Sequence, residues 1–370
     1  MNIISLIMLV FSLLGALDRI CGNRLGLGKE FEKGFILLGN ICLSMIGMIV
    51  ISPVIANLLS PAFDMVYNAL HIDPSIIPAS LFANDMGGAS LSTEIAKDAD
   101  IGMFNALVVS AMMGCTVSYT IPYSLGVVKQ DKIRELFLGF LCGFITIPVG
   151  CFVVGIFMGI GILPLLINLL PLIIFAAIIV CGLLFFPDVT VKVFSVFGVF
   201  MKILITIGLA LGILESLAGI EIIEGLADIK EGADICFNAA VVLSGAFPFM
   251  FVVSKILAKP IKKFGGAFGI NETAALGFVS SLVTNATSLE MINRMDKKGA
   301  VLNAAFAVSA SFVFGGHLAF TMAFDSAYIF PMIGAKLISG VSAFVVGLIV
   351  YKRIYGKAGA QDNGEETLVA

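Results

Sequence analysis

The stretch SLFANDMGGASLSTEIAKDAD, from Ser80 to Asp100, places acidic residues and a glycine pair inside an otherwise apolar chain. Asp85 comes just before Gly87 and Gly88, at a point where a membrane helix would otherwise continue. Glycine permits a sharp turn, and a carboxylate at membrane depth is costly enough that it usually has a function. The stretch therefore predicts a broken helix that carries a functional acid, provided that the surrounding chain lies in a membrane.

The composition is that of a protein that crosses the membrane many times. Of the 370 residues, 59% are hydrophobic and 13% are charged, and the mean hydropathy is +1.08, whereas a soluble domain carries about 25% charged residues. Apolar runs of about 20 residues recur without polar alternation, which favours spanning helices over a β-barrel. We therefore expect an all-α polytopic membrane protein, with residues 1–370 forming a single membrane domain.

The apolar runs predict about nine transmembrane helices and two semi-polar, interrupted segments, at about 75–97 and 272–295. The interrupted segments are expected to be re-entrant hairpins, which enter the membrane and return to the same side. The spanning helices are expected at about 2–17, 34–59, 102–128, 133–160, 163–186, 193–215, 235–258, 300–324 and 327–350.

Positive charge alternates along the chain in a way that fits this topology. Lysine and arginine gather after every second expected span, as at Lys129, Lys132 and Arg134, whereas the acidic loop at 215–234 contains one lysine. Because cytoplasmic loops carry the excess of positive charge, we expect the N-terminus outside and residues 351–370 to form a cytoplasmic tail. The alternation requires that neither interrupted segment crosses the membrane.

The two interrupted segments, with the residues that follow them, resemble each other. STEIAKDADIGMFNALVVSA (Ser92–Ala111) and SLEMINRMDKKGAVLNAAFAVSA (Ser288–Ala310) share a frame that pairs Glu94 with Glu290. Chance similarity between two helices rich in alanine and valine is the alternative explanation.

The expected topology relates two larger units, about 34–160 and 235–350, as an inverted repeat, because an odd number of spans separates them. Inverted repeats whose interrupted helices meet near the midplane are a transporter architecture. Matched interruptions are also the best sequence sign of the substrate site.

Each interrupted segment has a short polar tip, NDMGGAS at Asn84–Ser90 and VTNATS at Val283–Ser288. Unwound backbone is tolerated in a membrane only against protein or in a wet cavity. These tips are therefore expected to line a substrate site, with Gly87 and Gly88 as a hairpin hinge. The candidate substrate-binding residues are Asn84, Asp85, Glu94, Thr284, Asn285, Glu290 and His317.

Each acidic candidate also has a structural explanation. Asp85 could cap the helix that follows it. Glu94 could be solvated or pair with Lys97, and Glu290 has Arg294 one helical turn away.

Basic residues inside the apolar runs are few. His317 could be a buried histidine bonded to the backbone, a substrate contact or a protonation switch. Lys202 and Lys336 are expected to snorkel toward the cytoplasm rather than neutralise a carboxylate. Carboxylates with few cations nearby suit a positively charged ligand, which could be a metal cation, a proton or an organic amine.

The sequence indicates no cofactor, no resident metal and no nucleic-acid partner. The seven cysteines show no CxxC or Cys–His spacing, and the basic residues form no stripe. A coupling ion, H⁺ or Na⁺, stays an open question. The oligomeric state is open as well, with a homo-oligomer as one option.

Several motifs, in order along nearly the whole chain, carry a resemblance to a known family. They are FEKGFILLGN, MIGM, NDMGG, MDKKGAVLNAAFAVSASF, GGHLAF and IFPMIGAKLISG. With them the chain resembles the ethanolamine-utilisation membrane proteins, the ethanolamine permeases of bacterial ethanolamine-catabolism operons. One departure is Gly316, since the family often has an acid before the histidine, and this argues against an Asp–His pair here.

The resemblance implies uptake of ethanolamine across the bacterial inner membrane, to supply an ammonia-lyase inside the cell. The chemistry agrees, because an ammonium group suits a carboxylate such as Asp85, and a hydroxyl suits Asn84, Thr284 or Asn285. We expect a carrier or facilitator that works by alternating access around the two hairpins, and not an enzyme.

Other functions stay open at this point. A carrier for another small organic cation or a nucleoside-like solute is the main alternative. An intramembrane enzyme lacks support, because the sequence has no HExxH or GxSxG motif. A purely structural scaffold would leave the acids at broken helices unexplained.

Overall fold

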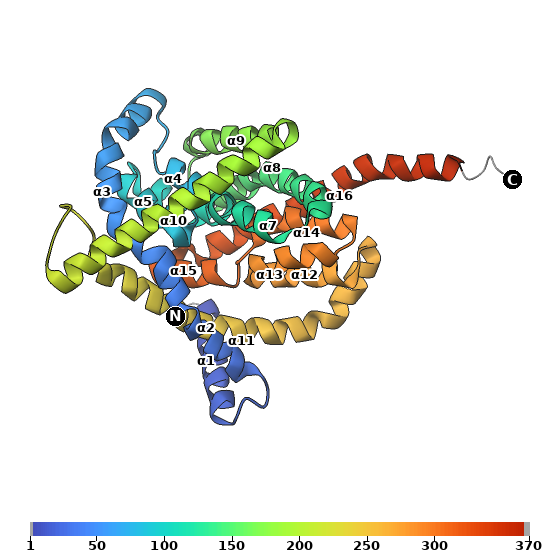
Figure 1. The fold of residues 1–370 in the computed structure, drawn as a ribbon, viewed down its shortest axis with the longest axis horizontal. Helices are drawn as coiled ribbons and strands as arrows, with labels where there is room; N and C mark the ends of the chain where they lie inside the picture. Colours follow the sequence, from blue (N-terminus) through green and yellow to red (C-terminus); the bar gives the residue numbers. More distant parts are fainter. Residues whose placement is uncertain (1–2, 366–370) are drawn as a thin grey trace.

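The computed structural model describes residues 3–365, and every regular element in that part of the chain is a helix (Figure 1). Eight helical stretches are long and apolar enough to cross a membrane. The chain is therefore an all-α, multi-pass membrane protein, which confirms the predicted class. The stretches are Ile3–Ile20, Leu27–Leu70, Ala99–Val127, Gln130–Phe157, Ile162–Phe185, Pro187–Ala218, Ile229–Ile256 and Ser326–Tyr355.

The elements divide into long helices and short pieces. The long helices are α1 (Ile3–Ile20), α3 (Leu38–Leu70), α8 (Ile133–Phe157), α9 (Ile162–Phe185), α10 (Pro187–Ala218), α11 (Ile229–Phe268) and α16 (Ile329–Glu365). The shorter α-helices are α2 (Leu27–Ile36), α4 (Ile76–Leu81), α5 (Gly88–Ile95), α6 (Ala99–Phe104), α7 (Ile121–Val127), α12 (Glu272–Val283), α13 (Asn285–Met291), α14 (Lys297–Ala310) and α15 (Gly316–Phe324). The 3₁₀ and π pieces are η1 (Asn84–Met86), η2 (Asn105–Gly114), η3 (Thr116–Thr120), η4 (Gln130–Lys132), η5 (Ile292–Arg294) and η6 (Ser326–Tyr328).

The span predicted at 300–324 is not one helix, so eight continuous apolar spans stand where about nine are predicted. α14 ends at Ala310 and α15 begins at Gly316, with an extended Ser311 and a left-handed Phe312 (φ 61°) between them. Hydropathy misses this break because it measures the apolar character of side chains, and the residues on both sides of the break are apolar.

The predicted boundary at the C-terminal end also differs. α16 runs as one helix to Glu365, so no helix end separates the span predicted at 327–350 from the tail predicted at 351–370. In Figure 1 the end of α16 projects away from the other helices. Residues 366–370 of the predicted tail lie outside the described residues, as does Asn2 of the first predicted span.

A long π-helical segment lies at the centre of the fold. Where the sequence predicts a span at 102–128, the chain forms π-helix in η2 and again in η3. Every residue of η2 is buried, and η2 packs against α4, α5, α14 and α16. Because π-helical turns are rare and often lie at functional sites, this segment is the first structural sign of where the site lies.

Small residues let the long helices approach one another closely. α10 crosses α3 (Figure 1) at Gly47, where an added Cβ would lie 1.9 Å from the Ile205 carbonyl oxygen. On the other side of η2, α8 packs against both α14 and α16. Close contacts through glycine are typical of membrane helices, because no hydrophobic force drives apolar helices together in lipid. Short broken pieces are thus enclosed between pairs of long helices.

Gly114 tests how tightly the first broken segment packs on η2. An added Cβ at Gly114 would lie 1.9 Å from the Phe82 carbonyl oxygen, so Gly114→Ala must displace the α4–α5 connection. We expect it to cost about 1–3 kcal/mol and to lower the thermal unfolding temperature in detergent, measured by circular dichroism. Gly126→Ala is the matched control, since nothing lies within 4 Å of a Cβ there. Equal unfolding temperatures for the two variants would contradict this packing.

Candidate functional site

Three breaks in the helices meet in space. The first lies between α4 and α5 at 82–87, the second is at Thr284 between α12 and α13, and the third is at 311–315 between α14 and α15. η1, in the first break, contacts both α15 and η2, and α13 contacts α7. Segments far apart in the sequence therefore converge around the π-helical pieces η2 and η3.

The second and third breaks are bonded to each other through their backbones. The Phe312 N–H donates to the Ser281 carbonyl (2.9 Å), and the Phe314 N–H donates to the Leu282 carbonyl (2.8 Å). These carbonyls belong to the last turn of α12, where a helix leaves acceptors without intrahelical partners. Gly315 makes the close approach possible, because a Cβ there would lie 2.0 Å from the Val283 carbonyl oxygen.

The first break is docked on η2 and η3. The Ala83 N–H donates to the Ser118 hydroxyl oxygen (3.1 Å). Gly87 then turns the chain with a left-handed backbone (φ 92°), and the Gly88 N–H donates back to the Ala83 carbonyl (2.8 Å). A side chain at Gly87 would collide with Met48 on α3. The glycine pair thus forms the turn that presents Asp85, and its role as a moving hinge stays a prediction.

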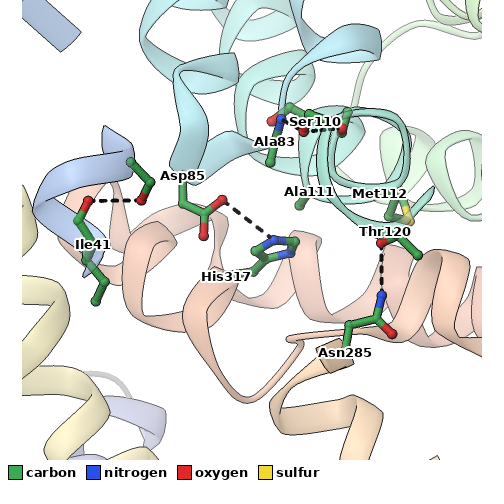
Figure 2. A network of polar contacts seen from close by, with 12 residues as sticks. Ile41, Ala83, Asp85, Ser110, Ala111, Met112, Thr120, Asn285 and His317 are labelled. Atoms are coloured by element: carbon green, nitrogen blue, oxygen red, sulfur yellow. Dashed lines mark hydrogen bonds and ion pairs between the residues drawn. The ribbon is translucent and has the colours of Figure 1, made fainter. Parts of the chain in front are cut away.

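A chain of charged and polar groups starts at Asp85. Figure 2 shows Asp85 directed from η1 toward His317 on α15, with Asp85 Oδ1 4.0 Å from His317 Nε2. On the other side of the ring, Lys336 Nζ lies 3.1 Å from His317 Nδ1. The same Nζ donates to the carbonyl of Ala111 (2.5 Å), a residue within the buried η2 segment.

The charge on Lys336 decides which ring nitrogen of His317 bears hydrogen. An ammonium can only donate, so beside a charged Lys336 the Nδ1 atom accepts and the hydrogen lies on Nε2, which faces Asp85. A neutral imidazole thus joins an ammonium to a carboxylate. Since the two end charges cancel, the site has no net charge without a ligand.

Asp85 is the accessible member of this group. His317 and Lys336 expose 1% and 0% of their surface, whereas the Asp85 side chain exposes 31%. The neighbouring Asn84 is fully buried, and neither polar atom of its side chain has a hydrogen-bond partner among the described residues. Because an unpaired buried amide costs about 1–3 kcal/mol, Asn84 is a ready partner for a bound polar group.

The second break contributes another amide. Asn285 is buried and donates from Nδ2 to the Thr120 hydroxyl oxygen (2.9 Å; Figure 2), while its Oδ1 has no partner in the described part of the chain. Its neighbour Thr284 is half-buried and lines a groove of about 420 Å³ between α11 and α12. The two predicted residues of this tip therefore face different spaces.

The two glutamates of the predicted repeat lie apart from Asp85. Glu94 is exposed and lines a pocket of about 100 Å³ against α3. Lys97, which was one possible partner for Glu94, pairs with Asp64 (2.6 Å). Glu290 is also exposed, and its carboxylate accepts a hydrogen bond from the Tyr123 hydroxyl (2.8 Å).

Two expectations drawn from the sequence are wrong here. Lys336 does not snorkel, because it is fully buried and bonded to His317. The expectation from Gly316 that no Asp–His pair forms is also wrong, because Asp85 on η1, and not residue 316, supplies the acid. A Cβ at Gly316 would lie only 3.6 Å from Asp85 Oδ2, so Asp85 approaches the position where an acid is often found in the family.

The sequence contained signals for two features that hydropathy overlooked. Lys336, inside IFPMIGAKLISG, is a charged residue within an apolar run, as Asp85 is. Charged residues at membrane depth usually have a function, so Lys336 could have been chosen as a candidate on the same ground. The Gly315–Gly316 pair repeats the signal of Gly87 and Gly88 and marks the third break. Tyr119, Thr120 and Phe312 carry no such signal, because only tertiary contacts bring them to the site.

With this geometry described, comparison with known proteins gives the family. A sequence model of the family described as "Ethanolamine utilisation protein, EutH" matches residues 1–350. The chain belongs to the EutH family. This confirms the resemblance seen in the sequence motifs.

Relatives within the EutH family align over almost the whole chain. A protein of Listeria monocytogenes named "Probable ethanolamine permease EutH" is 42% identical over 98% of this chain and 97% of its own length. Proteins of the same name from Salmonella typhimurium and Escherichia coli are each 36% identical, over 94% of this chain and 95% of their own length. Their names are those of permeases and not of enzymes. No solved structure matches the chain.

Lys336 provides a test of the charged chain. We expect Lys336→Met to lower the thermal unfolding temperature, because it leaves the Ala111 carbonyl and His317 Nδ1 without a donor at about 1–3 kcal/mol each. Lys202→Met, on an exposed part of α10, is the control and should change stability by less than about 0.5 kcal/mol.

A double-mutant cycle then tests whether Asp85 shares this chain. In an Asp85→Asn background the loss caused by Lys336→Met should be smaller, because no carboxylate is left without its counter-charge. Additive losses in unfolding free energy would show that the two charges are independent.

Proposed function

We propose that this protein carries ethanolamine across the cytoplasmic membrane, with the Asp85 carboxylate binding the ammonium group of the substrate. The observation that carries the proposal is the partly accessible carboxylate at the junction of three helix breaks. An accessible acid among apolar helices is costly to maintain and suits a cationic ligand. The names of the relatives, which are ethanolamine permeases, support ethanolamine as that ligand.

Two buried amides at the helix breaks can complement the other polar groups of ethanolamine. Ethanolamine has one hydroxyl, which can both donate and accept, and an ammonium with three donors. Asn84 and Asn285 each keep an unpaired amide oxygen, which can accept from either group. His317 Nε2 lies on one side of Asp85, so the substrate would approach the carboxylate from another side.

Alternating access around the two tips is part of this proposal. α4 and α5 have 6 and 8 residues, and α12 and α13 have 12 and 7, all too short for the roughly 20 residues of a full span. These lengths support two re-entrant hairpins of an inverted repeat, with units 34–160 and 235–350. The distribution of lysine and arginine supports an N-terminus outside and a cytoplasmic C-terminus in a bacterial inner membrane. A hairpin-bearing domain would move as an elevator.

The matching helices after the hairpins also support the repeat. The first unit continues into the π-helical pieces η2 and η3, and the second continues into α14 and the break at 311–315. Both are departures from a regular α-helix at corresponding places, and interrupted helices at corresponding places mark the substrate site in inverted-repeat carriers.

Asp85→Asn tests the function directly. We expect the variant to fold and to lose saturable uptake of labelled ethanolamine in proteoliposomes by at least about tenfold, because the amide removes a charge-assisted contact worth about 1.5–3 kcal/mol. Glu94→Gln is the comparison, since Glu94 lines a separate surface pocket, and should keep most of the uptake. Normal uptake by Asp85→Asn would remove Asp85 from the site.

We propose further that no coupling ion is needed. Lys336 already neutralises Asp85 when the site has no ligand, so the empty carrier can return without a bound H⁺ or Na⁺, and the loaded carrier bears one positive charge. The membrane potential then acts on that charge by about 2.3 kcal/mol per 100 mV.

Imposed gradients decide the coupling. Uptake into proteoliposomes should proceed without any ion gradient and should rise when a potassium diffusion potential makes the interior negative. Proteoliposomes with a pH gradient or a sodium gradient but no membrane potential should show no acceleration. An absolute requirement for either gradient would contradict the proposed charge balance.

A further inference from the structure

A row of aromatic rings connects His317 with the exposed Glu290. The ring of Phe312 lies 5.1 Å from the His317 ring and 5.7 Å, edge to face, from the Tyr119 ring. Tyr119 stacks on Tyr123 at 5.4 Å, and the Tyr123 hydroxyl donates to the Glu290 carboxylate. Five residues from four helices and one loop thus form a continuous path from the site to the protein surface.

These rings are less buried than the most enclosed aromatic residues of the structure. Phe104, Phe140 and Phe144 are fully buried, whereas Phe312, Tyr119 and Tyr123 each keep part of their surface accessible. The part of each residue that is accessible can contact a ligand.

Phe312 is held in an unusual conformation at the start of the row. Its φ of 61° is left-handed, which is rare for a bulky residue and costs about 1–3 kcal/mol. The hydrogen bond from its N–H to the Ser281 carbonyl fixes this conformation. Strained residues of this kind cluster at ligand sites, and here the strain places the ring between His317 and Tyr119.

We propose that Phe312, Tyr119 and Tyr123, with the Glu290 carboxylate, form a second binding station for organic ammonium ions between Asp85 and the surface. Aromatic ring faces attract ammonium groups, by about 0.5–2 kcal/mol per contact. Glu290 supplies a charge at the outer end, and the Tyr123 hydroxyl fixes its position. The station deepens the proposed function, on which it rests, because it gives the substrate a route to and from Asp85.

Uptake kinetics provide the first test. Tyr119→Leu and Glu290→Gln should each raise the KM for ethanolamine about fivefold, with kcat changed less, because they weaken cation binding on the route and leave Asp85 in place. Tyr119→Phe should rescue the KM, since it keeps the ring. Tyr67→Leu is the matched control, because Tyr67 lies on the exposed part of α3 beside His71, and it should behave as the unmodified protein.

Tyrosine fluorescence provides a second test that does not depend on transport. The chain has no tryptophan and six tyrosines, so cation binding at Tyr119 and Tyr123 can be followed directly. Titration of the purified protein with tetramethylammonium chloride should give a saturable change that sodium chloride does not give. The change should disappear in Tyr119→Leu and Tyr123→Leu and persist in Tyr67→Leu and in Asp85→Asn.

The two tests separate this inference from the proposed function. A tyrosine response that is lost in Tyr119→Leu supports the station, even if the unmodified protein takes up no ethanolamine and the proposed function fails. Normal ethanolamine uptake with an unchanged KM in Tyr119→Leu and Glu290→Gln, and without a saturable tetramethylammonium response, overturns the station and leaves the proposed function standing.

Discussion

Backbone groups that a broken helix frees among apolar helices need partners, and this constraint organises the centre of the fold. The last carbonyls of α12 find theirs in the loop at 311–315, through the N–H groups of Phe312 and Phe314. The first break finds its partner in the Ser118 hydroxyl of η3. Because lipid cannot supply these bonds, the breaks satisfy one another and lie together.

The junction of the breaks also determines where charge can reside. Asp85 lies just before a glycine turn, and His317 lies in the first turn of α15, just after the third break. Among the described residues, no helix separates the two side chains, which therefore approach each other. Lys336, on the continuous helix α16, lies on the other side of the His317 ring and forms hydrogen bonds with both His317 and the Ala111 carbonyl of η2. In the proposed function, a ligand cation would meet a carboxylate that Lys336 and His317 already orient and balance, which would reduce the reorganisation that binding requires.

Local features of the sequence predicted the first tip, and long-range contacts decided the rest. NDMGG places the turn and the acid within a few residues, so the break between α4 and α5 could be predicted from residue types alone. The third break and the burial of Lys336 depend on elements far away in the chain. Hydropathy does not predict them, because the residues next to each in the sequence are mostly apolar. The sequence frame that pairs Glu94 with Glu290 stays a prediction. Both residues are exposed in the structure, and pairing them by sequence could not show where either lies relative to Asp85.

A structure of the protein with ethanolamine in a lipid nanodisc would show whether Asp85 binds the substrate. Density for the ligand is expected with its ammonium nitrogen about 3 Å from the Asp85 carboxylate, on a side not occupied by His317, and with its hydroxyl toward Asn84 or Asn285. Ligand density only in the pocket beside Glu94 or in the groove beside Thr284, with the Asp85 carboxylate free at saturating ethanolamine, would contradict it.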